Sequence, residues 1–282
     1  MTHPVNSIVC FNGEFIDQNS PVFRCVDRAV CYGDGVFTTI RAVNGVIDSF
    51  DLHYQRLVTA ATVFDLNWCC PSEALKRNCA FILANNQLSE GLAALRVMLL
   101  RGGDAEGLSL PEATAASHWV IRGSRYRQPQ GTVRLITAPM IQSSQAWTVR
   151  FKTLNYLDAI MARRYARSQG YDDAIFCNEQ GNMVSTTSAN LFFLENGIIK
   201  TPATTAGALA GVMRARVLAY AHQAGIPVIE GHWPVAALHE AEAIWLTNSM
   251  MGVQCVTGVA EQVYPAGHPL LQVIQALCAK RL

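Results

Sequence analysis

The feature that most restricts the fold of this chain is the Asn-Gly pair, which occurs three times between apolar stretches. The pairs are Asn12-Gly13, Asn44-Gly45 and Asn196-Gly197. Both residues of a tight two-residue hairpin turn adopt positive φ angles, which Asn and Gly tolerate best, so each pair predicts two antiparallel strands joined by such a turn. Stretches with apolar residues at helical spacing lie between these hairpins. The sequence therefore predicts an α+β fold with mixed sheets.

The chain has 282 residues, enough for one large domain or two ordinary ones. Residues 124–131 contain several arginines and glutamines and a proline, which is typical of a linker between domains. We therefore expect a small N-terminal α/β domain over residues 1–123 and a larger C-terminal domain over residues 132–282.

Composition argues against several functional classes. Half of the residues are hydrophobic and 15% are charged, which indicates a compact protein rather than a disordered one. A net charge of +1 gives no electrostatic basis for binding nucleic acid or an anionic membrane. The nine cysteines include no C-x-x-C pair and no Cys/His spacing typical of zinc, so we expect reduced cysteines and no metal site. The N-terminus lacks the pattern of a signal peptide and no apolar run reaches membrane-spanning length, so the expected location is the cytoplasm.

Lys152 lies just ahead of a stretch with strong amphipathic helical periodicity. Four apolar residues recur on one side of the helix predicted over residues 157–166, and arginines occupy the other side. The apolar residues are Leu157, Ile160, Met161 and Tyr165. A strand predicted over residues 132–138 and a polar loop precede the lysine, so we expect Lys152 near the centre of the fold. A single lysine is usually solvated on the surface, so a role for this one depends on the segments around it.

Three further segments have features that suit an anion such as phosphate. Residues 204–214 form a glycine-containing loop that leads into a predicted helix. The first backbone N–H groups of that helix, at Val212 and Met213, and its dipole favour negative charge. Arg56 lies near the start of another predicted helix, and Ser249 follows an apolar strand. Each feature alone is common in proteins, so the assignment rests on their combination.

Six motifs in a fixed order contain these segments. They are Asp27-Arg28-x-x-x-Tyr32-Gly33-Asp34-Gly35-Val36-Phe37, His53-x-x-Arg56-Leu57, Lys152-Thr153-Leu154-Asn155-Tyr156-Leu157, Ala189-Asn190-Leu191-Phe192, Gly211-Val212-Met213-Arg214 and Leu246-Thr247-Asn248-Ser249. In order and content they resemble the fold type IV pyridoxal-phosphate enzymes. This family includes branched-chain and D-amino-acid aminotransferases and 4-amino-4-deoxychorismate lyase. The resemblance extends from Asn12 to about Thr257, nearly the whole chain, and implies the two-lobed architecture of that family.

The resemblance implies that the cofactor is pyridoxal 5′-phosphate. Lys152 would hold it covalently as a Schiff base, and a lysine amine beside a cationic group has a lowered pKa that suits it as nucleophile and base. Arg56, the backbone N–H groups of Val212 and Met213, and Ser249 would bind the phosphate.

The resemblance also implies roles around the cofactor ring. Tyr156 would face the ring hydroxyl, and Thr38 would line the substrate side as a second catalytic residue. Ser185 occupies the position that faces the pyridine nitrogen. The family works as a homodimer in which a loop from the partner's small lobe completes each site.

Within the family, several motifs are more similar to the lyase than to the aminotransferases. Thr38 and Thr39 follow Phe37, where aminotransferases usually have an acidic residue or a glycine. Arg101-Gly102 followed by residues 107–111 resembles a loop of the lyase. We therefore expect a lyase that converts 4-amino-4-deoxychorismate to 4-aminobenzoate and pyruvate in folate synthesis. The alternatives are a branched-chain or D-amino-acid aminotransferase and a non-catalytic relative that binds a metabolite.

Two positions depart from the family pattern. Ser185 stands where the family usually has a glutamate, and a hydroxyl cannot keep a pyridine nitrogen protonated as a carboxylate does. Glu106 stands where the lyase loop usually has an arginine. Recognition of a substrate with two carboxylates would then depend on other arginines. The candidates are Arg28, Arg41, Arg96, Arg122 and Arg125.

Overall fold

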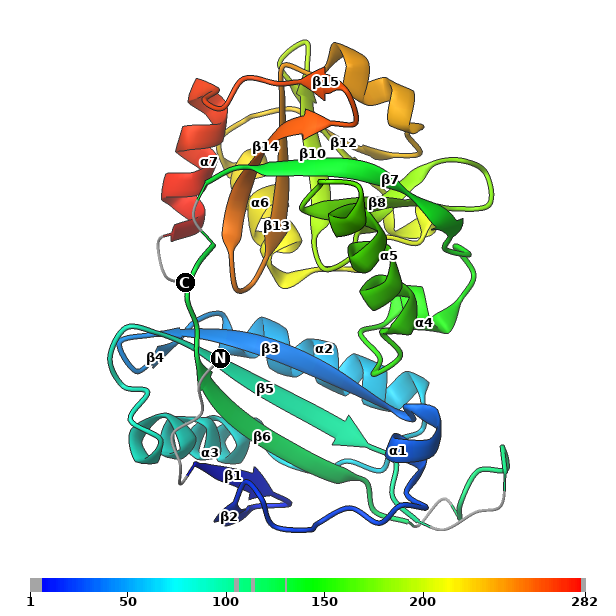
Figure 1. Ribbon diagram of the computed structural model, residues 1–282. Coiled ribbons are helices and arrows are strands. Elements are labelled where there is room, and N and C mark those ends of the chain that lie inside the picture. The colour runs from blue at the N-terminus through cyan, green and yellow to red at the C-terminus, as the bar shows by residue number, and fades with distance from the viewer. Residues whose placement is uncertain (1–6, 104–106, 113–114, 130, 280–282) are drawn as a thin grey trace. The chain divides into compact units, whose positions relative to one another are not determined.

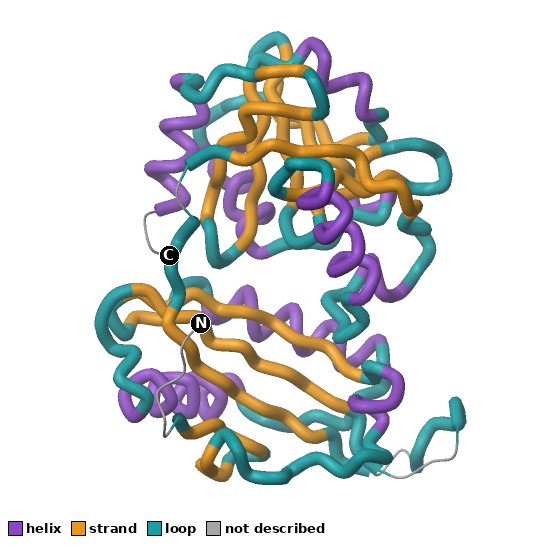
Figure 2. The backbone as a smooth tube through the Cα atoms, in the orientation of Figure 1, coloured by secondary structure: helices purple, strands orange, loops and turns teal. Residues whose placement is uncertain are grey.

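The computed structural model describes residues 7–103, 107–112, 115–129 and 131–279, which form two compact units (Figure 1, Figure 2). The first unit comprises the described residues up to Gln128 together with Lys152–Asn155. The second comprises Pro129–Phe151 and the described residues from Tyr156 onward. The boundary at Gln128 lies inside the segment whose composition resembles a linker. Lys152 is grouped with the first unit, although it falls in the range expected for the second domain.

The first unit is an antiparallel sheet of six strands, in the order β2-β1-β6-β5-β3-β4, with helices packed on it (Figure 1). Its strands are β1 (Ile8–Phe11), β2 (Glu14–Asp17), β3 (Gly35–Val43), β4 (Val46–Ile47), β5 (Leu92–Leu100) and β6 (His118–Arg125), and its helices are α1 (Arg28–Tyr32), α2 (Phe50–Val63) and α3 (Ser72–Asn85). Alternate residues of β5 from Ala93 to Leu99 are buried, because one face of the sheet packs against α2 and α3.

The three Asn-Gly pairs form the hairpin turns predicted from the sequence. Both residues of each pair have positive φ: 50° and 96° at Asn12-Gly13, 48° and 76° at Asn44-Gly45, and 52° and 72° at Asn196-Gly197. They join β1 to β2, β3 to β4, and β10 (Asn190–Glu195) to β11 (Ile198–Pro202), and each pair of strands is antiparallel. The hairpin predictions are therefore confirmed.

The second unit contains a mixed sheet of nine strands (Figure 1). Eight follow the order β12-β11-β10-β13-β14-β7-β8-β9, and β15 pairs with β14. The pairs β11–β12, β14–β7 and β7–β8 are parallel and the others are antiparallel. The remaining strands are β7 (Val133–Ile141), β8 (Asp173–Cys177), β9 (Met183–Thr186), β12 (Val228–Gly231), β13 (Ala243–Asn248), β14 (Gly252–Val259) and β15 (Gln262–Val263). The predicted α+β class with mixed sheets is confirmed.

Helices and short 3₁₀ turns connect and cover this sheet. They are α4 (Trp147–Arg150), α5 (Leu157–Ser168), η1 (Thr204–Ala206), α6 (Val212–Gln223), η2 (Val235–Glu240) and α7 (Pro269–Ala279). Helix α6 packs on β13 and α7 on β14, where Phe192, Trp245 and Ile274 lie in one buried cluster. In the described part of the chain, no helix is both long and apolar enough to cross a lipid bilayer.

Helix α5 forms where the sequence predicts it, but its apolar side is exposed in the chain. Leu157, Ile160 and Met161 keep 70%, 61% and 42% of their surface accessible. The residues that contact β7 and β8 are small: Ala162 and Ala166 are fully buried. The helical periodicity was therefore correct, whereas the side that packs on the sheet is the one with alanines.

Candidate active site

Lys152 lies on an extended segment that runs beside β3. The backbone N–H of Phe37 donates to the carbonyl of Lys152 at 2.9 Å, and the N–H of Leu154 donates to the carbonyl of Gly35 at 3.0 Å. An isolated antiparallel bridge also joins Val36 to the residue after the lysine. The lysine side chain reaches the aromatic ring of Phe37, with Nζ 4.6 Å from its centroid. The backbone of the sheet thus fixes the position of the lysine.

The pKa of the Lys152 amine lies near neutral pH. Its pKa is lowered from 10.5 to about 7, first by burial and then by the positive charges of Arg56 and Arg96. The residue as a whole keeps part of its surface exposed, so a substrate atom can reach it. An unprotonated amine can attack a carbonyl carbon or remove a proton. A pKa of about 7 leaves a substantial part of the amine unprotonated at neutral pH, as both of its expected roles require.

Thr38 and Arg56 meet beside this lysine, together with His53. Nη2 of Arg56 donates to Oγ1 of Thr38 at 2.5 Å, and the same oxygen lies 2.6 Å from Nδ1 of His53. Thr38 is fully buried and His53 is 1% exposed. Burial lowers the pKa of His53 well below its ordinary value, and the charges of Arg56 and Lys152 lower it further.

Three arginines project from one face of the first sheet. Strand pairing places Arg96 opposite Thr39 on β3 and opposite Arg122 on β6. Arg41 lies two residues beyond Thr39, so its side chain leaves the same face. The guanidinium carbon of Arg96 is 3.9 Å from the ring centroid of Phe37, the ring that Lys152 also approaches. This face therefore combines the candidate catalytic amine with positive charge suited to carboxylates.

The other two candidate arginines bind the protein itself. Arg28 is buried, and its Nε donates to a carboxylate oxygen of Asp34 at 2.8 Å. Its Nη1 donates to the carbonyls of Gly107 and Ser109, both at 2.9 Å. Arg125 donates to backbone carbonyls of residues 87 and 90. These contacts favour a structural role for both arginines over recognition of a substrate.

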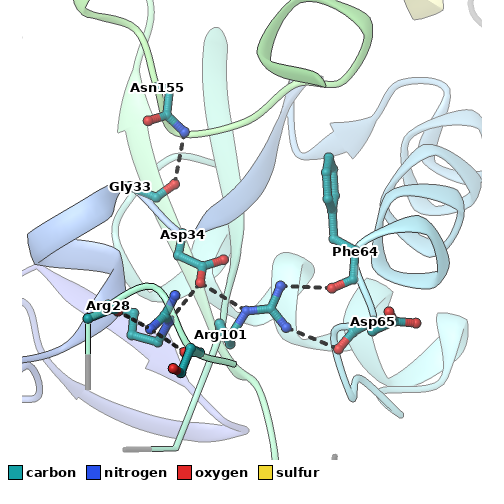
Figure 3. A network of polar contacts seen from close by, with 9 residues as sticks. Arg28, Gly33, Asp34, Phe64, Asp65, Arg101 and Asn155 are labelled. Carbon is teal, nitrogen blue, oxygen red and sulfur yellow. Dashed lines mark hydrogen bonds and ion pairs between the residues drawn. The ribbon is translucent and has the colours of Figure 1, made fainter. Parts of the chain in front are cut away.

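Asp34 is the centre of a polar network, and Figure 3 shows it between the side chains of Arg28 and Arg101. Nε of Arg101 donates to the same carboxylate oxygen at 2.9 Å, and its terminal nitrogens donate to the carbonyls of Phe64 and Asp65. Asp34 therefore links the end of α2 to the backbone around residues 107–109. Glu106, the departure noted in this loop, lies outside the described residues.

In the second unit, the N-cap residue just before helix α6 has to be glycine. A Cβ added to Gly211 would lie 2.1 Å from Oδ1 of Asn190, far inside any contact distance. Nδ2 of Asn190 donates to the carbonyl of Leu209 at 2.8 Å, so this side chain is held in place. Gly211, the N-cap residue, has no side chain that could cap the helix. The first N–H groups of α6, at Val212 and Met213, suit an anion such as a phosphate group.

The structure places the other predicted residues of the second unit on defined elements. Ser249 lies in the turn after β13 and is partly buried, and Tyr156 is the residue that precedes α5. Ser185 lies on β9, opposite Phe176 of β8. Its hydroxyl donates to the carbonyl of Thr186 at 2.9 Å. The roles of these residues in binding a cofactor remain predictions.

A pocket of about 400 Å³ opens in the second unit near the start of α6. Its walls combine hydroxyls, an amide and one guanidinium group with apolar surface: Ser144, Gln145, Arg150, Phe151, Thr204, Thr205, Ala208 and Ala210. The carboxylate of Glu179 accepts hydrogen bonds from the backbone N–H and the hydroxyl of Ser144, at 2.9 and 2.5 Å. These hydrogen bonds lower the pKa of Glu179. This wall of the pocket is therefore fixed by polar contacts.

His53 and Asp34 also make polar contacts in this region, although the sequence suggested no role for either residue. Both lie inside motifs that carry the family resemblance, one in His53-x-x-Arg56 and one just after Gly33. Asp34 binds Arg28 of its own motif and also Arg101, which is 67 residues away, and His53 contacts Thr38, which is 15 residues away. The signal was therefore present in the motifs, but the contacts that explain it are tertiary.

The sequence matches the family described as "Amino-transferase class IV" over residues 35–259. The chain belongs to this family. An aminodeoxychorismate lyase of Vibrio harveyi is 27% identical over 243 residues, which cover 83% of this chain and 86% of that protein. A D-alanine aminotransferase of Listeria monocytogenes is 25% identical over 255 residues, covering 89% and 87%. The solved structure of a branched-chain aminotransferase from Thermoproteus uzoniensis superimposes with a TM-score of 0.89, at 24% identity and with 97% and 93% of the two chains covered.

The fold and the cofactor follow from this membership. The chain has the fold of the type IV pyridoxal-phosphate enzymes, and its cofactor is pyridoxal 5′-phosphate. The described residues fit this group: Lys152 has a near-neutral amine, and α6 begins with backbone N–H groups that no side chain caps. The relatives include both a lyase and an aminotransferase at similar identity, so membership establishes an enzyme family and leaves the reaction open.

Proposed function

We propose that the protein is a lyase that converts 4-amino-4-deoxychorismate to 4-aminobenzoate and pyruvate. The observation that carries this proposal is the residue at position 185. A carboxylate beside the pyridine nitrogen would keep it protonated, because an opposite charge stabilises the cation. Ser185 instead has a neutral hydroxyl that donates to the carbonyl of Thr186. Transamination requires the ring to hold a negative charge until the cofactor carbon is protonated, and it suffers most from a weaker electron acceptor.

Elimination requires less electron withdrawal by the cofactor ring than transamination does. When bound, pyridoxal phosphate withdraws electrons from the substrate carbon that carries the amine. The unprotonated amine of Lys152 removes the proton from this carbon, which its lowered pKa permits near neutral pH. The bond from the neighbouring carbon to the enolpyruvyl oxygen then breaks, and the carbon ring becomes aromatic. The leaving group departs as an enolate, which takes up a proton to become pyruvate. Because the leaving group and the aromatic product take up the electron pair, a neutral residue at position 185 suffices.

The charge of the first sheet supports a substrate with two carboxylates. Arg41, Arg96 and Arg122 leave the same face, and Arg96 lies over the ring that Lys152 also approaches. Nε of Arg41 is buried and has no hydrogen-bond partner among the described residues. Like charges that lie directly opposite each other on neighbouring strands repel, and a bound carboxylate relieves this repulsion. Branched-chain amino acids have a single carboxylate and an apolar side chain, so they fit this face less well.

The remaining contacts with the cofactor are those that the family resemblance implies. Arg56, the N–H groups of Val212 and Met213, and Ser249 bind the cofactor phosphate. Tyr156 binds the ring hydroxyl.

The proposed assembly is a homodimer. The exposed apolar side of α5, with Leu157, Ile160 and Met161, supports an interface with a second copy, because such residues are normally covered in a stable assembly. All nine cysteines are free thiols, which supports a reducing compartment such as the cytoplasm, where folate synthesis would use the product.

The test compares wild type with Ser185→Glu and, as the matched control, Ser185→Ala, which removes the hydroxyl without adding charge. Each protein is loaded with cofactor and given 4-amino-4-deoxychorismate, and 4-aminobenzoate is measured by its fluorescence. In parallel, D-alanine or L-leucine is added and pyridoxamine phosphate is followed by absorbance.

We expect wild type to form 4-aminobenzoate and to transaminate slowly. Ser185→Glu should gain transamination relative to lyase turnover, and Ser185→Ala should not. Fast transamination by wild type, without a gain in Ser185→Glu, would support an aminotransferase instead. A loaded protein with neither activity would point to a non-catalytic metabolite-binding relative.

A further inference from the structure

A buried chain of three polar side chains connects β3 to α2 next to Lys152. His53 and Arg56 are one helical turn apart on α2, and both face Thr38 on β3. The Thr38 oxygen is 2.5 Å from Nη2 of Arg56 and 2.6 Å from Nδ1 of His53. Both distances are short, and both Thr38 and His53 are almost completely shielded from solvent. Water therefore cannot replace either contact.

The chemistry of the three groups fixes the direction of the hydrogen bonds. A guanidinium group can only donate, so the Thr38 oxygen accepts from Arg56. A hydroxyl has one proton, and His53 is the other partner of this oxygen among the described residues. The hydroxyl satisfies both neighbours when its proton points to Nδ1 of His53. The imidazole is then a neutral acceptor, with its own proton on Nε2.

Protonation of the His53 imidazole would reverse the direction of its hydrogen bond with Thr38. A proton on Nδ1 would make His53 a donor, and the Thr38 oxygen would then accept two bonds while its own proton lost its buried acceptor. Burial and the nearby charges of Arg56 and Lys152 oppose this protonation. The site thus maintains His53 in the one state that completes the chain of hydrogen bonds.

We propose that His53 is a positioning residue: its neutral imidazole orients the Thr38 hydroxyl, which in turn fixes the guanidinium group of Arg56 for the cofactor phosphate. The inference rests on the proposed role of Arg56 and extends it by two residues. It also gives Thr38 a positioning role, because its hydroxyl is already engaged by two side chains. A guanidinium group held before the ligand arrives loses less conformational entropy on binding, which increases affinity.

The test measures binding of pyridoxamine 5′-phosphate to the apo-protein. This compound lacks the aldehyde, so its affinity reports phosphate contacts rather than the covalent bond to Lys152. The informative variants are His53→Leu, which removes the acceptor at similar size, and Thr38→Val, which removes the hydroxyl at the same shape. His53→Asn is the conservative variant, because its side-chain oxygen can take the place of Nδ1. Thr59→Val is the matched control, since Thr59 is exposed on the same helix and bonds only its own turn.

We expect His53→Leu and Thr38→Val each to weaken binding about tenfold, as expected for loss of one hydrogen bond to a charged group. The double variant should be no weaker than either single one, because both act through the same contact. His53→Asn should recover most of the affinity, and Thr59→Val should bind as wild type does. Additive losses, or unchanged binding in His53→Leu, would refute the proposal.

A second measurement does not depend on any variant. The imidazole nitrogens of His53 in the wild-type apo-protein are observed by ¹⁵N NMR at neutral pH, and we expect a neutral ring with the proton on Nε2. A proton on Nδ1 overturns the proposed hydrogen-bond direction even if the variants fail to fold. Unchanged binding in Arg56→Ala, with the expected tautomer present, would instead refute the phosphate role of Arg56 and leave the orientation of Thr38 intact. Neither result distinguishes a lyase from an aminotransferase.

Discussion

Replacing Lys152 by methionine should stabilise the free protein at neutral pH. Methionine has nearly the shape of lysine without its charge, and the amine of Lys152 lies where a charge is disfavoured by burial and by two arginines. Lowering the pKa from 10.5 to about 7 corresponds to about 5 kcal/mol, at about 1.4 kcal/mol for each tenfold change in proton affinity. Because Lys152 keeps part of its surface exposed, solvent screening reduces the expected gain to about 2–3 kcal/mol.

The gain has a definite dependence on pH. The folded-state pKa of Lys152 is lower than the unfolded one, so the unfolded chain binds the proton more tightly. The destabilisation is therefore complete below about pH 7 and shrinks as the pH rises towards 10.5, where the amine is neutral in both states. At about pH 9.5, one unit below the unfolded pKa of 10.5, we expect about 1.4 kcal/mol of the gain to remain.

The assay is urea unfolding of the apo-proteins at both pH values, followed by circular dichroism. Lys76→Met is the matched control, because Lys76 is an exposed lysine on α3. If Lys152→Met is no more stable than wild type at neutral pH, the Lys152 amine does not destabilise the folded protein. A gain of equal size at both pH values would show that it comes from packing rather than from the lowered pKa.

Two further predictions concern the cofactor and the assembly. Arg56→Ala should weaken retention of pyridoxal phosphate by about 1.5–3 kcal/mol, because it removes a charge-assisted contact to the phosphate; equal cofactor absorbance of mutant and wild type after dialysis contradicts this. Ile160→Glu should convert the proposed homodimer to monomers at micromolar concentration, measured by light scattering, because it places a charge on the exposed apolar side of α5. Val263→Glu, at an exposed apolar position on β15, should leave the assembly unchanged, and a dimer in both variants would rule out this interface.

Local sequence signals predicted the local elements of this fold well. An Asn-Gly pair determines a hairpin because both residues tolerate positive φ, and all three pairs have such angles. The order of the strands in the sheets could not be predicted from such local signals. In the first sheet β6 pairs with β5 and also with β1, whose residues lie more than a hundred positions away in the sequence. Periodicity contains no information on such pairings, so the strand order was not predicted from the sequence.

Helix α5 shows a second limit of sequence patterns. Its apolar residues recur at helical spacing, but Leu157 and Ile160 are exposed, and Ala162 and Ala166 pack on the sheet. Periodicity detects that a helix has two unlike sides and does not determine which side contacts the same chain. A side with large apolar residues can serve another chain, whereas small residues allow a helix to approach its own sheet closely.

The polar contacts of the site were the least predictable part. His53 and Thr38 are fifteen residues apart in the sequence and meet only because α2 packs on β3. The family motif marked Arg56, but the tautomer of the imidazole and the direction of the Thr38 hydroxyl depend on distances of 2.5 and 2.6 Å that no spacing rule provides. The lowered pKa of Lys152 likewise depends on burial and on the charges of Arg56 and Arg96, which come from α2 and β5.

Each unit contains one feature that lowers the stability of the free protein and suits an anionic or electrophilic ligand. In the first unit it is the amine of Lys152, whose protonation is disfavoured. In the second it is the start of α6, where a serine or aspartate in place of the N-cap Gly211 would stabilise the helix by roughly a few tenths of a kcal/mol. Asn190 excludes any such side chain, because a Cβ on Gly211 would collide with its Oδ1. Since Asn190 also fixes the carbonyl of Leu209, the chain has a specific contact that maintains this helix start without a cap. An uncapped helix retained in this way is better explained by a ligand that binds its N–H groups than by the stability of the fold.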